Sequence, residues 1–486
     1  MTEDKPVTSN NLRSPSRLWL VIVGVTGLVL RALTVLLYQP VAYSDTPSYR
    51  RLAEAVRGGF VNYDGTRTPG YPVFLALTGS DENAWLVQLL LGFITTLLMF
   101  YIGWKLTDKP WFGGLIALVH TLNLGQLFFE SNLLTESLTT FLLVLTMAGV
   151  LFWLVNPNKR GVGLSFLLGL VSTISTLVRP LFIFLPFLLL IFLYLTSRIK
   201  SPSIVSIHDG SSKDEANPKY SKRYHWRIGI AFILPVILLL GGWISFIHAQ
   251  FGDWSLTTMT GYHLIQHTGS FFEYVPDEYA SIRDIYIQYR DEHIAQFGTQ
   301  TNSIWDAIPE MSRISGYSFY ELSRVLARVS INLILKHPVL FIKSAINGWW
   351  MFWRTSVYWS AEALRVSWLA GGVELTIQIQ RAMLFLTNLV FIFGSLYYAL
   401  NAFITAVRHK PAQVGIHFAI PAQQAFFWLL LGTIWVTSIL QTLLDHGDNP
   451  RFLVPLQSLL VLWVAVFIFQ LAHRRPVGSN PASLPE

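Results

Sequence analysis

Asp45 is the first residue of the chain whose type and setting suggest chemistry. It lies in "YSDTPSY", in a polar stretch between two long apolar runs. The following stretch, "TPSYRRLAEAVRGG", has a proline at the first helical position and apolar residues along one face, and Gly58 provides a stop. Two interpretations stay open. Asp45 is a general base that takes a proton from a hydroxyl group, or it is the N-cap of a short surface helix, a role that Thr46 could fill as well.

Arg67 and Tyr71 lie slightly further along the same polar stretch, in "RTPGYP". The Pro69-Gly70 pair suits the central positions of a type II turn, and the second proline stiffens the residues after it. We expect this turn to hold the polar loop against the membrane, with Arg67 as an additional contact for a phosphate group and Tyr71 as a supporting residue. The alternative is a turn that serves only to return the chain to the membrane.

Three more arginines have the chemistry of a phosphate site, because a guanidinium offers two parallel N–H donors to phosphate oxygens. Arg179 in "LVRPLFIFLPF" and Arg451 in "DNPRFLVPLQSLL" lie at the predicted outer ends of apolar runs. They form a phosphate clamp or, alternatively, anchor their helices at the membrane interface. Arg31 lies deeper in the first apolar run, where an ionisable group is costly and a functional role is the default. It would support the phosphate or pair with Glu136.

Glu136 follows the start of another apolar run, in "LLTESLTTFLLVL". It would orient one of the arginines, share a metal ion with Asp45, or serve only as a helix-start carboxylate that the helix dipole favours. His446 and Asp448 form a second polar group beside Arg451. We expect them to shape the donor-phosphate site or to cap a helix.

The histidines of "HLIQH", His263 and His267, have the spacing that can bind zinc on one face of a helix. The sequence offers no third ligand and no glutamate in the zincin position, so this pattern alone does not favour a zinc site. No cofactor is specified by the sequence, and proton transfer to a single carboxylate does not require a divalent metal.

The elements that must position these residues are membrane helices. Of the 486 residues, 52% are hydrophobic and 13% are charged, whereas a soluble domain has about a quarter charged residues. The first apolar run is longer than a signal-peptide core and lacks a convincing cleavage site, and the absence of cysteine excludes disulfides and thiolate metal sites. Ten apolar segments match the length of a membrane-spanning helix: 18–38, 84–104, 111–129, 132–154, 161–178, 180–197, 228–249, 381–404, 424–444 and 452–472.

The distribution of lysine and arginine predicts the orientation of these segments. With a cytoplasmic N-terminus, the inner segments hold 18 of the 35 basic residues and 7 of the 28 acidic residues, a net charge of +11, and the rest of the chain carries −4. The overall charge of +7 therefore reflects the orientation of the protein in the membrane and does not indicate nucleic-acid binding. We expect a multi-pass protein of the cytoplasmic membrane, with both termini in the cytoplasm and the candidate site on the outer face.

The need to place the basic segments on the inner side limits the number of spans. Arg408 and Arg474 must both lie inside, so residues 250–380 contain either no further crossing or two, and the stretch 337–359 either lies on the membrane or crosses it. We expect an all-α polytopic membrane protein with about 10–12 transmembrane helices, an amphipathic first outer loop and a larger outer segment. The predicted parts are an N-terminal transmembrane core (1–249, with the outer loop 39–83 and the inner linker 198–227), an outer or interfacial module (250–380) and C-terminal transmembrane helices (381–486).

In their order along the chain, these stretches resemble the GT-C glycosyltransferases. Arg31 in the first span is followed by "SDTPSYRRLAEAVRGG", "RTPGYP", "LLTESLTTFLLVL", "LVRPLFIFLPF" and "DNPRFLVPLQSLL", a pattern most similar to the protein O-mannosyltransferases and the bacterial lipid A aminoarabinose transferases. The resemblance covers about residues 17–200 and 445–472. It implies a polyprenyl-phosphate-linked sugar as donor, an outward active site and inversion at the anomeric carbon. That family often has an Asp-Glu pair in the first outer loop, whereas Thr46 follows Asp45 here, which counts against a paired-carboxylate metal site.

The leading hypothesis is a transferase that moves one sugar from a polyprenyl phosphate to a glycan, lipid or protein acceptor outside the membrane. A lipid phosphate leaves as a stable anion, so one general base suffices, whereas a glycosidase needs an acid and a second carboxylate. Asp45 would be that base, and Arg179 and Arg451 would hold the phosphate. The alternatives are a membrane transporter or lipid flippase, in which Arg31 would line a path, and an oligosaccharide ligase or polymerase that uses a pyrophosphate-linked donor.

Overall fold

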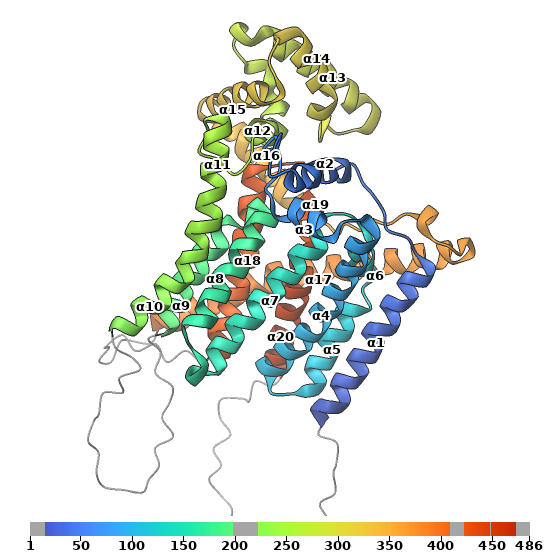
Figure 1. The fold of residues 1–486 in the computed structure, drawn as a ribbon, viewed down its shortest axis with the longest axis vertical. Coiled ribbons are helices and arrows are strands. Elements are labelled where there is room, and N and C mark those ends of the chain that lie inside the picture. The colour runs from blue at the N-terminus through green and yellow to red at the C-terminus, as the bar shows by residue number, and fades with distance from the viewer. Residues whose placement is uncertain (1–14, 198–221, 409–421, 448, 473–486) are drawn as a thin grey trace, which may run out of the picture.

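The computed structural model describes residues 15–197, 222–408, 422–447 and 449–472, and these residues fold almost entirely into helices (Figure 1). Within them the only β contact is an isolated bridge between Val41 and Asn132. Eight helices in these ranges are long and apolar enough to cross a membrane, or up to ten if each of two bent helix pairs is one span. The prediction of an all-α polytopic membrane protein is confirmed.

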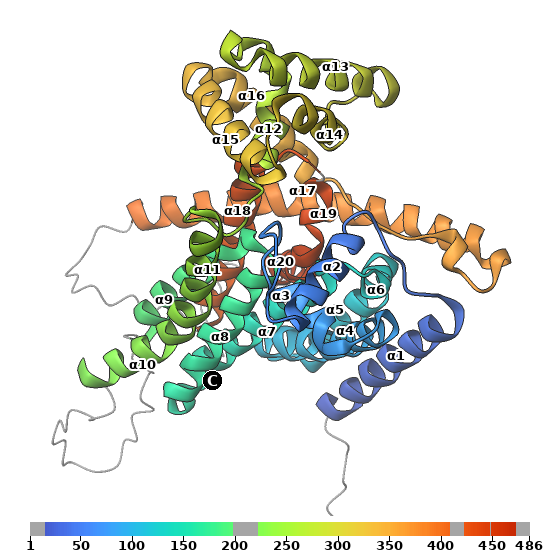
Figure 2. The ribbon, with the colours of Figure 1, turned by 45° about the horizontal axis from the view of Figure 1, so that its top comes forward.

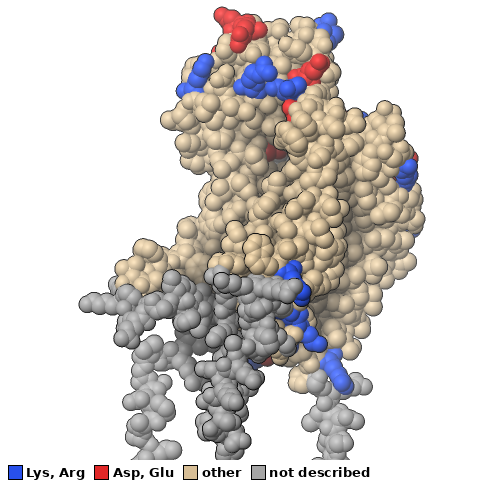
Figure 3. All heavy atoms as spheres, turned by 60° about the vertical axis from the view of Figure 1, so that its left-hand side comes forward, with Lys and Arg blue, Asp and Glu red and all other residues tan. Residues whose placement is uncertain are grey.

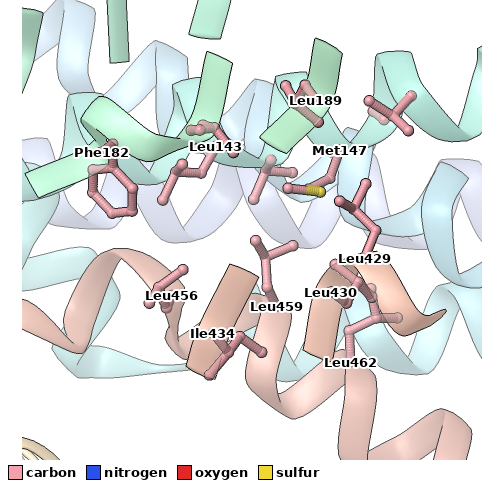
Figure 4. Packing of buried hydrophobic residues seen from close by; sticks show 14 of the residues in the cluster. Leu143, Met147, Phe182, Leu189, Leu429, Leu430, Ile434, Leu456, Leu459 and Leu462 are labelled. Atoms are coloured by element: carbon pink, nitrogen blue, oxygen red, sulfur yellow. The ribbon is translucent and has the colours of Figure 1, made fainter. Parts of the chain in front are cut away.

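The membrane bundle combines helices from both ends of the chain. Its helices are α1 (Pro15–Leu37), α4 (Asp81–Thr107), α5 (Pro110–Thr121), α6 (Leu124–Ser131), α7 (Thr135–Val155), α8 (Val162–Val178), α9 (Phe184–Ser197), α10 (Lys222–Pro235), the π-helix η4 (Val236–Gly241), α11 (Gly242–Phe251), α17 (Ala370–Arg408), α18 (Ala422–Leu444) and α20 (Val454–Ala472). Leu143 of α7, Leu430 of α18 and Leu459 of α20 belong to one hydrophobic core (Figure 4). The N-terminal and C-terminal helices therefore form a single packed unit.

Several basic helix ends gather at one end of this bundle. The start of α1, the turn between α4 and α5, and the 3-10 helix η1 (Pro157–Lys159) lie at the lower end in Figure 1. These ends carry Arg17, Lys105, Lys109 and Lys159. Figure 3 shows a wide band without charged side chains between this end and the charged opposite end. Such a band suits the hydrocarbon layer of a bilayer.

The opposite end of the bundle carries a helical module with its own hydrophobic core. Tyr262, Phe272, Tyr286 and Leu326 are among the buried side chains of this core. The module lies above the bundle in both ribbon views (Figures 1 and 2). It consists of α12 (Thr260–Thr268), the 3-10 helices η5 (Gly269–Tyr274) and η6 (Asp277–Tyr279), α13 (Ala280–Phe297), α14 (Ser303–Ser315), α15 (Phe319–Lys336) and α16 (Pro338–Phe352).

Helix α16 lies within the stretch 337–359, whose position relative to the membrane the sequence left open. It is bent by 106° against α15. Its 15 residues extend over about 22 Å at 1.5 Å per residue, and the hydrocarbon core of a bilayer is about 30 Å thick. Helix α16 alone is therefore too short to cross a bilayer. Val339, Ile342 and Ile346 are exposed along one side of it, an arrangement suited to the membrane interface.

The loop 39–83, which the sequence predicts to be the first outer loop, forms two short helices, α2 (Thr46–Arg57) and α3 (Gly70–Thr78). The predicted type II turn at Pro69-Gly70 was wrong, because Pro69 has right-handed helical angles (φ −76°, ψ −11°) and α3 begins at Gly70. A Cβ atom on Gly70 would lie 2.5 Å from the backbone of Leu177 and Val178. Glycine is thus required here for close approach of α3 to the end of α8, and not for a turn conformation.

Candidate functional site

The predicted amphipathic helix after Asp45 is present as α2. It has a proline in its first turn, ends before Gly58, and buries Tyr49, Leu52 and Ala53 on one face. Thr46 fastens its first turn to the bundle, because the Thr46 Oγ1 atom accepts a hydrogen bond from the Tyr43 N–H at 2.9 Å and donates one to the Leu133 carbonyl at 3.1 Å. The start of α2, and with it Asp45, is therefore held against the bundle.

Asp45 stands at the N-cap position of α2, but its carboxylate turns toward two arginines. Asp45 Oδ1 accepts a hydrogen bond from Arg67 Nη2 at 2.7 Å, and Asp45 Oδ2 accepts one from Arg451 Nη1 at 2.7 Å. Arg67 comes from the same loop, whereas Arg451 comes from α19 (Asn449–Phe452), just before the last span. The N-cap interpretation accounts for the position of Asp45 but not for the direction of its side chain.

Glu136 holds the other side of the arginine group. It is fully buried in the first turn of α7, where the helix dipole favours a carboxylate. Glu136 Oε1 accepts a hydrogen bond from Arg451 Nε and lies 3.4 Å from Arg179 Nη2. Arg179 follows directly after α8. The structure therefore brings together five of the predicted site residues: Asp45, Arg67, Glu136, Arg179 and Arg451.

A cavity of about 280 Å³ opens onto this group. Its polar wall includes Asp45, Arg67, Arg179 and Arg451, and we call it the Asp45 cavity. Leu181, Ile183, Leu256 and Leu444 provide an apolar wall. The cavity lies where the first outer loop, the start of η2 (Pro180–Ile183), the end of α18 and α19 meet. It therefore offers cations and apolar surface in one space.

Two guanidinium donors at this cavity have no hydrogen-bond partner in the described part of the chain. They are Arg67 Nε and Arg179 Nη1, and both atoms are buried. One buried acceptor of the same group, Glu136 Oε2, is also without a partner within the described residues. A buried donor that finds no acceptor costs about 1–3 kcal/mol, so the arrangement favours a bound group that supplies oxygen atoms.

The arginines control the protonation of Asp45. Burial raises the pKa of this carboxyl group, because it disfavours the charged form, but the nearby charges of Arg67 and Arg451 outweigh burial and lower the pKa to about 2. The pKa of Arg451 is raised above its usual range, because its charge is stabilised by Glu136 and Asp45 more than burial destabilises it. All of these groups are therefore ionised at neutral pH, and Asp45 can accept a proton.

Asp445 is a site residue that the sequence pattern did not indicate. It lines the Asp45 cavity, and its Oδ2 atom lies 2.9 Å from Nδ1 of His263, which lines the same cavity. A second oxygen, Asp445 Oδ1, accepts the Gly447 N–H at 2.8 Å. The sequence favoured the adjacent residue, His446, instead. Only the fold shows that α12 brings His263 to Asp445 across 182 residues.

Arg31 and Tyr71 do not line the Asp45 cavity. The expected pairing of Arg31 with Glu136 was wrong, because Arg31 Nη2 donates to Glu130 Oε1 at 2.7 Å inside the bundle. Arg31 also donates to Thr121 Oγ1 at 2.8 Å. Tyr71 is buried behind the cavity wall, where its hydroxyl donates to Gln88 Oε1 at 3.0 Å. Its ring contacts that of Tyr49 edge-on, with centroids 4.9 Å apart.

The remaining predicted residues lie apart from the arginine group. His267 Nδ1 is 3.0 Å from Ser344 Oγ, and His446 Nε2 accepts a hydrogen bond from Asn347 at 3.2 Å. Asp448 and the greater part of the predicted linker 198–227 lie outside the described residues. Within the residues described, no group of three or more histidine, cysteine, aspartate or glutamate side chains is arranged to hold a metal ion. Both Asp45 and Glu136 instead bind Arg451.

A scan of the chain against models of protein families finds no match, and neither does a comparison with curated protein sequences.

Proposed function

We propose that the protein is a glycosyltransferase that moves a single sugar from a polyprenyl-phosphate carrier to an acceptor on the outer side of the cytoplasmic membrane. The observation that carries this proposal is the pair of buried donors without a partner in the described residues, Arg67 Nε and Arg179 Nη1, in a cavity that also contains a carboxylate. Phosphate oxygens would satisfy both donors, and arginine is suited to bind them through more than one N–H group.

The charge of the site supports an anionic ligand. Arg67, Arg179 and Arg451 provide three positive charges, and Asp45 and Glu136 provide two negative ones. Within this arginine group, one positive charge is left for the phosphodiester of a lipid-linked sugar, and Asp445, a third carboxylate at the same cavity, is paired with His263. The apolar wall of the same cavity suits the isoprenoid units next to that phosphate. A free sugar phosphate would not need this apolar wall.

Asp45 is the proposed general base. In the transfer step, the bond between the anomeric carbon and the phosphate oxygen breaks, a bond from the acceptor oxygen to the same carbon forms on the opposite face, and the acceptor proton moves to Asp45. The lipid phosphate leaves with the electron pair of the broken bond and is stabilised by the arginines. When phosphate oxygens engage Arg67 and Arg451, these side chains hold the Asp45 carboxylate less strongly, and its basicity rises.

The test uses the full-length protein in proteoliposomes with synthetic polyprenyl-phosphate hexoses and pentoses, and cell-envelope extract as the source of acceptor. We expect release of polyprenyl phosphate together with sugar transfer. Asp45→Asn should lower the rate by roughly 10²–10⁴-fold, the usual contribution of general base catalysis. Asp81→Asn is the matched control, because Asp81 forms an exposed ion pair with Arg50 in the same region.

Three outcomes would contradict the proposal. Full transfer by Asp45→Asn would remove Asp45 as the base. Release only from pyrophosphate-linked oligosaccharides would favour a ligase or polymerase. Movement of the lipid-linked sugar across the bilayer without transfer would favour a flippase.

A further inference from the structure

A second cavity lies in the outer module, on the other side of the segment that carries Asp445. It has a volume of about 690 Å³, within the range of about 300–1,000 Å³ that is typical of ligand sites. We call it the Lys343 cavity. Its wall includes Ser270, Arg290, Gln300, Lys343, Asn347 and His446. None of these residues belongs to the arginine group of the Asp45 cavity.

Lys343 gives the second cavity a positive charge without a counter-charge. It is exposed on α16, and no ion pair joins it to any residue of the described ranges. Arg290, another residue of the wall, is by contrast paired with two carboxylates, since its Nη2 atom lies 2.6 Å from Glu273 Oε1 and 2.8 Å from Asp291 Oδ1. Lys343 is therefore the residue of this cavity that favours a negatively charged group on a ligand.

His446 adds a buried hydrogen-bond donor. The amide nitrogen of Asn347 lies 3.2 Å from His446 Nε2, and because an amide nitrogen only donates, Nε2 accepts and the ring proton resides on Nδ1. Burial lowers the pKa of His446, so the imidazole is neutral. His446 is 4% exposed, and its Nδ1 atom has no partner in the part of the chain that the structure describes. An acceptor oxygen from a ligand would satisfy this donor.

The two cavities share a wall. Asp445 lines the Asp45 cavity, and the next residue, His446, lines the Lys343 cavity. Helix α12 contributes to the same wall, since His263 lines the first cavity and His267, one turn later, hydrogen-bonds Ser344 of the second. Of the two histidines in "HLIQH", one therefore lines the first cavity and the other contacts a wall residue of the second. The Asp445–His446 segment therefore connects the wall of the Lys343 cavity with that of the proposed transfer site.

We propose that the Lys343 cavity binds an anionic glycan and that this glycan is the sugar acceptor. The first part stands independently, and the second part rests on the function proposed above. Lys343 would bind a carboxylate or phosphate of the glycan, and His446 Nδ1 one of its oxygens. Ser270, Gln300 and Asn347 provide hydroxyl and amide groups of the kind that bind sugar hydroxyls.

The first experiment measures binding to the full-length protein in nanodiscs, without donor. The probes are tri-galacturonic acid and neutral maltotriose, and the readout is isothermal titration calorimetry. We expect the acidic trisaccharide to bind more tightly than the neutral one. Lys343→Ala should weaken acidic binding by about tenfold or more, as for loss of a hydrogen bond to a charged group. Lys336→Ala is the matched control, because Lys336 is also exposed, at the end of the adjacent α15.

A second variant tests whether a loss of binding by Lys343→Ala results from misfolding. Lys343→Arg keeps the charge and should retain most of the acidic binding, and the melting temperatures of all variants are compared. Equal binding of the acidic and neutral probes, unchanged binding by Lys343→Ala, or no binding by the wild type at a probe concentration on the order of 10 mM would overturn the glycan site. Unchanged binding by Lys343→Ala would assign Lys343 to the lipid interface.

The second experiment separates this inference from the proposed transferase. Transfer from the polyprenyl-phosphate sugar is measured with the same variants. If the site holds the acceptor, Lys343→Ala should raise the KM for the acceptor and leave the KM for the donor unchanged. If Lys343→Ala weakens probe binding but leaves sugar transfer unchanged, the Lys343 cavity is not the acceptor site. If the wild type binds the acidic probe but transfers no sugar, this result contradicts the proposed transferase activity and not the glycan site.

Discussion

Asp45 and Arg451 lie 406 positions apart in the chain, and a hydrogen bond of 2.7 Å joins Asp45 Oδ2 to Arg451 Nη1. The same guanidinium donates through Nε to Glu136 at the start of α7. One side chain therefore joins the first outer loop, the middle of the bundle and the start of the last span. The Asp45 cavity is complete only when the N-terminal and C-terminal helices are packed together.

Replacement of Arg451 should affect both stability and donor binding. Arg451→Gln leaves Asp45 and Glu136 without their shared cation, and breaking a buried ion pair costs about 3–5 kcal/mol. We expect a lower melting temperature and a higher KM for the donor. Arg451→Lys keeps the charge but not the planar fork, so it should fall between wild type and Arg451→Gln. Arg354→Gln, which changes an exposed arginine, is the control. Wild-type stability and KM in Arg451→Gln would contradict this role.

The pH dependence of transfer should depend on the arginines around Asp45, because these arginines lower its pKa. The pKa of Asp45 is lowered to about 2 from an ordinary 3.8, so its ion pairs stabilise the fold fully above pH 3.8. This stabilisation, of order 2 kcal/mol, is lost as the pH falls through 2. Arg67→Gln removes one of the two cations, and burial then raises the pKa.

We therefore expect the acid limb of the kcat/KM profile to move to higher pH in Arg67→Gln. Arg50→Gln, which removes an exposed cation from α2, should leave the limb where it is. The profile is measured in proteoliposomes from about pH 2 to 8, a range that includes the pKa of Asp45. An unchanged acid limb in Arg67→Gln would show that Asp45 is not the group that titrates.

Much of the fold was predictable from local patterns, because apolar length and basic residues determine which segments cross a membrane. The helix after Asp45 was also predictable, since its proline, apolar face and terminal glycine act locally. The type II turn was wrong because the need for Gly70 comes from α8, about one hundred residues away in sequence. The partner of Arg31 was wrong for a similar reason. Glu130 lies at the end of one apolar run, in α6, and Glu136 at the start of the next, in α7, so only the packed structure shows which of them pairs with Arg31.

The site was predicted in part. Asp45 and the arginines could be identified by residue type, but their pairing could not, since hydrogen bonds over hundreds of residues leave no local pattern. Asp445 was missed because its partner, His263, is distant in sequence and comes from the helical module at one end of the bundle. That module, residues 260–352, matched no known pattern, and its cavity depends on packing among η5, α13, α16 and the loop that carries His446.

Gly70→Ala tests the packing that places α3 beside Arg179. The added Cβ atom would meet the backbone of Leu177 and Val178, which cannot rotate away as a side chain could. Overpacking of this kind costs about 1–3 kcal/mol, and the displacement reaches the residue before Arg179. We expect a lower melting temperature and a higher KM for the donor. Gly163→Ala is the matched control, because Gly163 is also in the first turn of a helix and has open space around it. Equal melting temperatures and equal donor KM values for Gly70→Ala and Gly163→Ala would contradict the proposed packing.

Arg31 and Glu130 should prove to be a structural pair. Glu130 is fully buried, and Arg31 is 5% exposed and donates to Glu130, Thr121 and two carbonyl groups. Arg31→Gln leaves a buried carboxylate without its cation, at a cost of about 3–5 kcal/mol. The double variant with Glu130→Gln should be less destabilised than the sum of the single variants, because neither charge remains.

The donor KM of the folded fraction distinguishes this structural role from a contact with the donor phosphate. Since Arg31 does not line the Asp45 cavity, we expect Arg31→Gln to lower the amount of folded protein and leave that KM unchanged. Arg17→Gln, an exposed arginine in the first turn of the same helix, should change neither. A donor KM raised tenfold or more at unchanged stability, equal to a loss of about 1.4 kcal/mol of binding, would return Arg31 to the phosphate site.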